Sequence, residues 1–179
     1  NYIHQFEDMM AGDSFDDPES GYPAWIDVDS FIDFFLISEF GKNVDSYRLS
    51  SYLYKDRDGK DGKLHAGPVW DYNLAYGLAN YYDGEDIDGW MLEHLLYNVG
   101  AGDFQVPFWW EKLLNDPTFN HRIKQRWTTL RSSVFDLNRV NQFINAMADT
   151  LADAQARNFT LWPAPGERGS GFWPMPGVC

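Results

Sequence analysis

The fold of this chain is decided by one stretch, Ser50-Ser51-Tyr52-Leu53-Tyr54, which is followed by the polar loop 55–63 and by Leu64-His65-Ala66-Gly67-Pro68-Val69-Trp70. The two outer segments contain the aromatic and other apolar residues that favour extended strands. The loop between them holds only charged residues and two glycines. Two such segments around a glycine-containing polar loop predict a long β-hairpin, with strands over 50–54 and 64–70.

The loop of this hairpin superficially resembles a calcium-binding loop, because Asp56, Asp58 and Asp61 are closely spaced in it. The EF-hand pattern fails, since Lys60 occupies a ligand position and no Glu stands at the twelfth position. We therefore expect these three carboxylates to be solvated surface groups.

Strand pairing predicts that two aspartates lie close together. If Tyr54 pairs near Leu64, the residue numbers of any two partners in the antiparallel ladder sum to about 118. Asp45 and Asp71 sum to 116, so both are expected at the open end of the hairpin, away from its tip. Two carboxylates there suit a metal site or acid–base chemistry. The alternative is structural: Asp45 caps a turn, and Asp71 accepts backbone N–H bonds.

Helical periodicity dominates the rest of the chain. A helix end is predicted over 1–11, followed by a loop over 12–24 and by a buried helix that Asp29 or Ser30 caps and Gly41 ends. Further helices are predicted over 89–98, 106–115 and 117–133 and after the cap Asp136, and an extended Pro/Gly-rich tail over 163–179. The predicted fold is α+β, mainly α, with a small antiparallel hairpin beside a helical bundle, in one domain over residues 1–179.

Charge and composition exclude several classes of partner. The 179 residues carry a formal net charge of −13. Residues 1–90 hold 19 acidic and 6 basic side chains, whereas residues 91–179 hold 8 of each. This balance argues against nucleic acid and anionic membranes, which are polyanions. The longest aliphatic and aromatic run, 34–37, is far too short to span a membrane. The single cysteine, Cys179, rules out an internal disulfide.

Three motifs follow one another around the hairpin: Gly41-Lys42-Asn43-Val44-Asp45-Ser46-Tyr47, Ser51-Tyr52-Leu53-Tyr54-Lys55-Asp56 and Gly67-Pro68-Val69-Trp70-Asp71-Tyr72-Asn73-Leu74-Ala75-Tyr76-Gly77. In this order they resemble the core of the CotH family, the spore-coat-protein-H-like proteins, which have an atypical protein-kinase-like fold. Residues 27–35, 113–119 and 157–163 are also similar to that family. The resemblance covers about residues 1–177 and corresponds to the rear lobe of the kinase-like fold.

The resemblance implies Mg²⁺-dependent transfer of phosphate from ATP to Ser or Thr hydroxyl groups of proteins. Asp45 matches the catalytic aspartate that orients the acceptor hydroxyl and takes its proton, and Asp71 matches the aspartate that holds the metal. Two positions depart from the pattern. Ser50 stands where a kinase has a metal-binding Asn, and Asn73 stands where active members commonly carry Asp. Asp71, Asn73 and Ser50 are therefore the predicted metal ligands, with less negative charge than in active relatives.

No glycine-rich strand–loop–strand precedes this core, and Lys42 is the first lysine of the chain. We therefore expect a rear lobe whose front, ATP-covering lobe is absent from this chain, and which is inactive by itself. The resemblance suggests a secreted or bacterial cell-surface protein that acts on a protein substrate or a cell-surface partner.

The alternative is a catalytically inactive, extracellular structural or carbohydrate-associated module, a pseudokinase that binds a glycan. The best candidates for an exposed sugar-stacking surface are Phe108-Trp109-Trp110 and Trp173. Trp70 is instead expected to pack beneath the paired aspartates, as a large aromatic residue in a small domain usually does.

Overall fold

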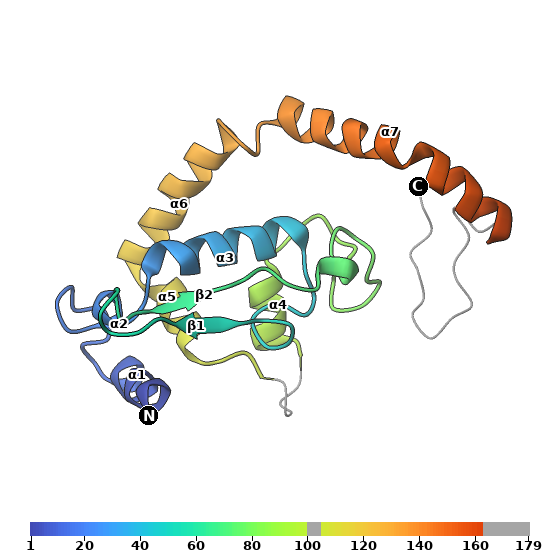
Figure 1. The fold of residues 1–179 in the computed structure, drawn as a ribbon. Helices are drawn as coiled ribbons and strands as arrows, with labels where there is room; N and C mark the ends of the chain where they lie inside the picture. The colour runs from blue at the N-terminus through green and yellow to red at the C-terminus, as the bar shows by residue number, and fades with distance from the viewer. Residues whose placement is uncertain (100–104, 163–179) are drawn as a thin grey trace. The chain divides into compact units, whose positions relative to one another are not determined.

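The structure of this protein, a computed structural model, describes residues 1–99 and 105–162. Along the chain lie α1 (Tyr2–Ala11), α2 (Tyr22–Trp25), α3 (Val28–Gly41), β1 (Leu53–Lys55), β2 (Leu64–Ala66), the 3₁₀ turn η1 (Tyr72–Leu74), α4 (Met91–Tyr97), α5 (Trp109–Asn115), α6 (Pro117–Arg131) and α7 (Leu137–Leu161) (Figure 1). Helices and one small antiparallel sheet confirm the α+β, mainly α class.

The chain divides into two units, residues 1–123 and residues 124–179. One domain over residues 1–179 stays a prediction. The expected extended tail, 163–179, and Trp173 within it lie outside the described residues. In the part of the chain that the structure describes, no helix combines the length and the apolar character that a membrane crossing requires.

Helix α3 begins two or three residues earlier than expected from a cap at Asp29 or Ser30. Asp27 is the N-cap, and its side chain accepts the Ser30 N–H at 2.8 Å, while the Ser30 hydroxyl donates to the Asp27 carbonyl oxygen. Asp29 and Ser30 are therefore inside the helix. At the other end Gly41 is the last helical residue, and Lys42 adopts the left-handed conformation with φ 48° that was expected of Gly41.

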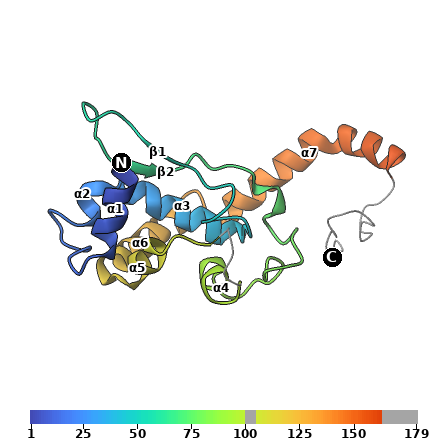
Figure 2. The ribbon, with the colours of Figure 1, turned by 90° about the horizontal axis from the view of Figure 1, so that it is seen from below.

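The aromatic face of α3 forms the centre of unit 1–123. Phe31 and Phe34 are buried and pack on Trp110 of α5, with ring centroids 5.5 and 6.0 Å apart. Trp109 bridges α3 and α1 through Phe31 and Phe6, so α5 lies beside both helices (Figure 2). Because Trp109 and Trp110 are only 5% and 2% exposed, they are core residues and not the sugar-stacking surface that was a candidate.

The hairpin exists, but its strands are shorter than predicted. Pairing joins Leu53 to Ala66, Tyr54 to His65 and Lys55 to Leu64, so the residue numbers of partners sum to 119, one more than the expected value of about 118. The regular ladder has only these three pairs because Ser50, at φ 42°, and Gly67, at φ 127°, leave the extended conformation.

The remaining helices lie close to their predicted ranges. Asp136 caps α7 as expected, accepting the Asn138 and Arg139 N–H groups. Helices α4 and α5 begin two or three residues later than predicted, and α6 ends at Arg131. The short helix α2 was missed within the predicted loop 12–24, since four residues carry too little periodicity to be recognised.

Candidate active site

Asp45 lies in a turn, residues 43–50, that connects the end of α3 to the hairpin. We call this segment the Asp45 turn. Its backbone is held by two short-range hydrogen bonds, from Ser46 N to the Asn43 carbonyl oxygen at 3.1 Å and from Leu49 N to the Asp45 carbonyl oxygen at 3.0 Å. The Asn43 side chain also accepts the Asp45 N–H, at 3.3 Å. The turn is therefore ordered without belonging to the sheet, so strand pairing does not by itself position Asp45.

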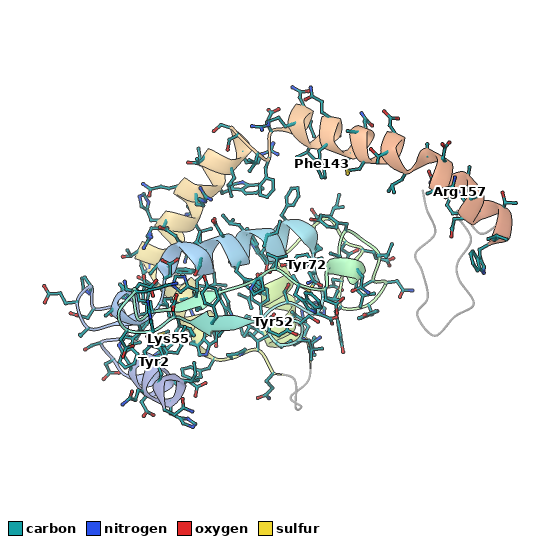
Figure 3. The ribbon with its side chains drawn as sticks, in the orientation of Figure 1. Tyr2, Tyr52, Lys55, Tyr72, Phe143 and Arg157 are labelled. Carbon is teal, nitrogen blue, oxygen red and sulfur yellow. The ribbon has the colours of Figure 1, made fainter. Side chains whose placement is uncertain are left out.

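Asp71 follows β2 and immediately precedes η1, which is fastened to the end of α3. The Tyr72 hydroxyl lies 3.0 Å from the Ser38 hydroxyl, and the Tyr76 N–H donates to the Gly41 carbonyl oxygen at 2.6 Å. Figure 3 shows Tyr72 at this end of α3. Because the Asp45 turn also starts from the end of α3, both segments are built on the same helix terminus.

The two segments meet through their side chains. The Ser50 hydroxyl donates a long hydrogen bond, 3.4 Å, to Oδ2 of Asp71. Asp45 is close enough to Asp71 for its pKa to respond to the charge of that neighbour. Ser50 and Asp71 both have left-handed backbones, at φ 42° and 61°. Such conformations cost on the order of 1 kcal/mol or more each and persist where the surrounding structure enforces them, often at functional sites.

Burial raises the pKa of Asp45 above its ordinary value, and the negative charge of Asp71 adds to the rise. The neighbouring Arg48 opposes it. Arg48 is held in turn by the Val44 carbonyl oxygen, at 3.4 Å, and by the ring of Tyr82, 4.9 Å from the guanidinium carbon. Asp45 is thus a partly buried carboxylate with one cation and one anion beside it, and its proton affinity is higher than that of a surface aspartate.

The donors around Asp71 are hard oxygen ligands. Asp71 and Asn73 are exposed, and the Ser50 hydroxyl is the group that reaches Asp71. Magnesium commonly binds through one or two carboxylates, with waters and substrate phosphates filling the other positions. Within residues 1–99 and 105–162, no three His, Cys, Asp or Glu side chains gather into a potential metal site. Asp71, Asn73 and Ser50 carry oxygen donors of the type that magnesium binds together with a phosphate ligand.

Trp70 does not pack beneath the aspartates as expected. Its side chain is 57% exposed and makes an edge-to-face contact with Tyr52, which is 51% exposed, at a centroid distance of 6.4 Å. The reason is the short ladder: once the strand conformation ends at Gly67, the alternation of buried and exposed residues no longer applies. Trp70 and Tyr52 form an exposed aromatic pair, and Trp70 directly precedes Asp71 in the chain.

Three residues near the site were not found from the sequence: Arg48, Tyr47 and Glu39. Arg48 and Tyr47 belong to the Asp45 turn, where no periodicity distinguishes inward from outward side chains. Glu39 did carry a signal, since it is a charged residue within a helix that was predicted to be buried. Its hydrogen bonds to Tyr47, Met91 and Leu92 give the reason for its position.

Neither the curated proteins nor the solved structures contain a match to this chain. A family model described as CotH kinase protein matches residues 1–171, which is nearly the whole chain. On that match, the chain belongs to the CotH kinase family.

Proposed function

We propose that this chain carries the catalytic-loop and metal-binding part of a Mg²⁺-dependent kinase that transfers the γ-phosphate of ATP to Ser or Thr hydroxyl groups of proteins. Membership of the CotH kinase family supports a kinase-like function. The observation that carries the finer proposal is the convergence of Asp45, Ser50 and Asp71 from the two segments that flank the hairpin.

Asp45 has the role of the base that accepts the proton of the acceptor hydroxyl. A general base works best when its pKa lies near the working pH, and burial with a neighbouring negative charge moves Asp45 in that direction. The nearby Arg48 favours the approach of an anionic phosphoryl group, because positioned cations stabilise the charge of the transferring group.

Asp71, with Ser50 and Asn73, has the role of holding the magnesium ion. When bound, the ion neutralises phosphate charge during transfer. The chain itself supplies the carboxylate and neutral oxygen ligands and keeps Ser50 on Asp71. The site lies in a strongly acidic half of the chain. A polyanionic nucleotide therefore needs the metal in order to bind there.

Calorimetry with Mg²⁺-ATP on the full-length natural protein tests this proposal. Asp71→Ala is expected to weaken binding at least tenfold, which is about 1.4 kcal/mol. Asp58→Ala is the matched control, because Asp58 is an aspartate of the same hairpin whose partner is Lys55, at 2.5 Å. Unchanged Mg²⁺-ATP binding in Asp71→Ala would contradict the metal role of Asp71.

A second candidate function is carbohydrate binding by an inactive module at a cell surface. One observation favours it: the exposed pair Trp70 and Tyr52 offers the kind of aromatic surface on which sugars stack. An array of glycans that gives no signal with the wild-type protein would argue against this candidate, and loss of a signal in Trp70→Ala would support it. The extracellular or bacterial-surface location belongs to both proposals.

A further inference from the structure

Tyr47, in the middle of the Asp45 turn, has a backbone conformation that a bulky residue rarely adopts. Its φ is 72°, in the left-handed region. Short polar residues such as Asn and Asp enter this region far more readily than an aromatic residue does. The left-handed Tyr47 lies between Asp45 and Ser50. Its backbone conformation therefore sets the position of one of these residues relative to the other. Some interaction must therefore hold Tyr47 in place.

The side chain of Tyr47 supplies that interaction. Its ring is 2% exposed and packs edge-to-face on Phe34 and on Trp110, at centroid distances of 5.9 and 5.1 Å. At the end of the ring, the hydroxyl donates to Oε1 of Glu39 at 2.6 Å. The turn is thus anchored into the core at the left-handed Tyr47.

Glu39 extends the same anchor to a third segment. Its Oε1 also accepts the Leu92 N–H at 3.0 Å, and its Oε2 accepts the Met91 N–H at 2.7 Å. These are the first two N–H groups of α4, whose own N-cap, Trp90, provides no side-chain hydrogen bond. One carboxylate of α3 therefore caps α4 and holds the Asp45 turn at the same time.

The ionised form of Glu39 is costly to the fold. Burial raises its pKa, although the three hydrogen bonds and the charge of Lys42 oppose the rise. A carboxyl with a raised pKa contributes stability below its ordinary pKa that is lost as the pH rises.

We propose that Tyr47 and Glu39 are positioning residues for Asp45: the Tyr47–Glu39 hydrogen bond holds the Asp45 turn in the conformation that presents Asp45 and Ser50 to Asp71. This inference rests on the proposed kinase function. Neither residue touches substrate, metal or ATP in this role. Small displacements of a reacting group reduce rates strongly, about 100-fold for 1 Å. Loss of the anchor therefore acts on turnover.

The test compares two tyrosines in the full-length protein. Tyr47→Phe removes the hydroxyl and keeps the buried ring. Tyr22→Phe is the matched control, because Tyr22 is also 2% exposed and donates to a carboxylate, Asp116, at the same distance of 2.6 Å. Both variants are expected to lose similar thermal stability. Only Tyr47→Phe is expected to lower kcat, by tenfold or more.

Amide hydrogen exchange on this chain gives a second readout that does not require activity. The Ser46 and Leu49 N–H groups make the backbone hydrogen bonds of the Asp45 turn. They are expected to exchange at least tenfold faster in Tyr47→Phe, while amides of α1 keep their rates. In Tyr22→Phe the Ser46 and Leu49 rates stay those of the wild type.

Glu39→Ala removes the other partner of the same hydrogen bond, so the conclusion does not depend on Tyr47→Phe alone. If both residues act through one hydrogen bond, the double variant Glu39→Ala/Tyr47→Phe lowers kcat no further than Glu39→Ala does. Equal kcat and exchange rates in wild type and Tyr47→Phe would overturn the positioning role. Failure of the proposed function looks different: Asp45→Asn would then leave turnover unchanged, whereas the exchange measurement still decides whether Tyr47 orders the turn.

Discussion

The two ends of the hairpin use the same residue type in opposite ways. At the tip, each carboxylate has a basic partner close in the sequence: Lys60 lies 2.6 Å from Asp56, Lys55 lies 2.5 Å from Asp58, and His65 lies 2.6 Å from Asp61. At the open end, Asp45 and Asp71 approach each other, and Arg48 is the cation that acts on Asp45.

The pKa shifts follow this difference. The Lys60 hydrogen bond lowers the pKa of Asp56, and the Lys63 backbone N–H, together with His65, lowers the pKa of Asp61. Burial and Asp71 raise the pKa of Asp45. Carboxylates that are already paired are inert surface groups. Carboxylates that converge with little compensation remain available to a cation or proton from outside, which is what a phosphoryl-transfer site requires.

Asp45→Asn is the substitution with the largest expected effect on this comparison. The amide cannot accept the proton of the acceptor hydroxyl, so phosphate transfer by the full-length protein is expected to fall about 10²- to 10⁴-fold. Asp58→Asn at the tip is expected to leave the rate unchanged. The measurement is the initial rate of phosphate incorporation into a protein substrate, and a rate for Asp45→Asn within twofold of wild type would remove the base role.

Ser50→Asn tests the proposed metal site at the open end of the hairpin, because it replaces a weak ligand with a stronger one. Asn tolerates the left-handed backbone of position 50, at φ 42°, better than Ser does, so the fold should be retained. Its amide oxygen reaches further toward Asp71 than the Ser50 hydroxyl, which already lies 3.4 Å away. We expect Mg²⁺-ATP affinity in calorimetry to rise several-fold. Ser51→Asn is the control, and weaker binding in Ser50→Asn would show that Ser50 is not a ligand position.

The smallest expected effect is the pH dependence of thermal stability. Its sign differs between Asp45 at the open end of the hairpin and Asp61 at the tip. The raised pKa of Asp45 means that its contribution is present below the ordinary value of 3.8 and is lost as the pH rises. Asp45→Asn should therefore gain in Tm relative to wild type between about pH 3 and pH 7.

The pKa of Asp61 is lowered, so its contribution is present above 3.8 and is lost as the pH falls through the lowered value. Asp61→Asn should therefore lose Tm relative to wild type at pH 7, and the difference should disappear in acid. Thermal melts of the two variants across this pH range measure both trends. Two curves with the same slope would mean that the two ends of the hairpin are electrostatically alike.

The hairpin shows which structural features local sequence can predict and which it cannot. Alternating apolar residues and a glycine-containing loop predicted both strands, because turn geometry and side-chain alternation are local properties. The strands are shorter than predicted, because left-handed residues such as Ser50 have no signal in a strand pattern. The partners sum to 119, close to the expected value of about 118. The burial of Trp70 was expected from its residue type alone, as a large aromatic residue in a small domain, whereas its side chain is 57% exposed.

Helix caps show a similar limit. Asp136 was identified correctly because nothing competes with it before the apolar pattern of α7 begins. At α3 the expected caps were Asp29 and Ser30, but the N-cap is Asp27, and Val28 packs into the core as the first helical residue. The choice between neighbouring caps was therefore made by packing, which a single segment cannot reveal.

The sequence by itself determined the mainly helical class, the hairpin and the family to which the chain belongs, because these depend on residue patterns along short segments. Only the tertiary structure decided which groups surround Asp45. Glu39 and Tyr47 are eight residues apart, and Met91 is more than fifty residues from Glu39, yet they meet on one carboxylate. Such a contact depends on how α3 packs against α4, and no local preference of the chain encodes that arrangement.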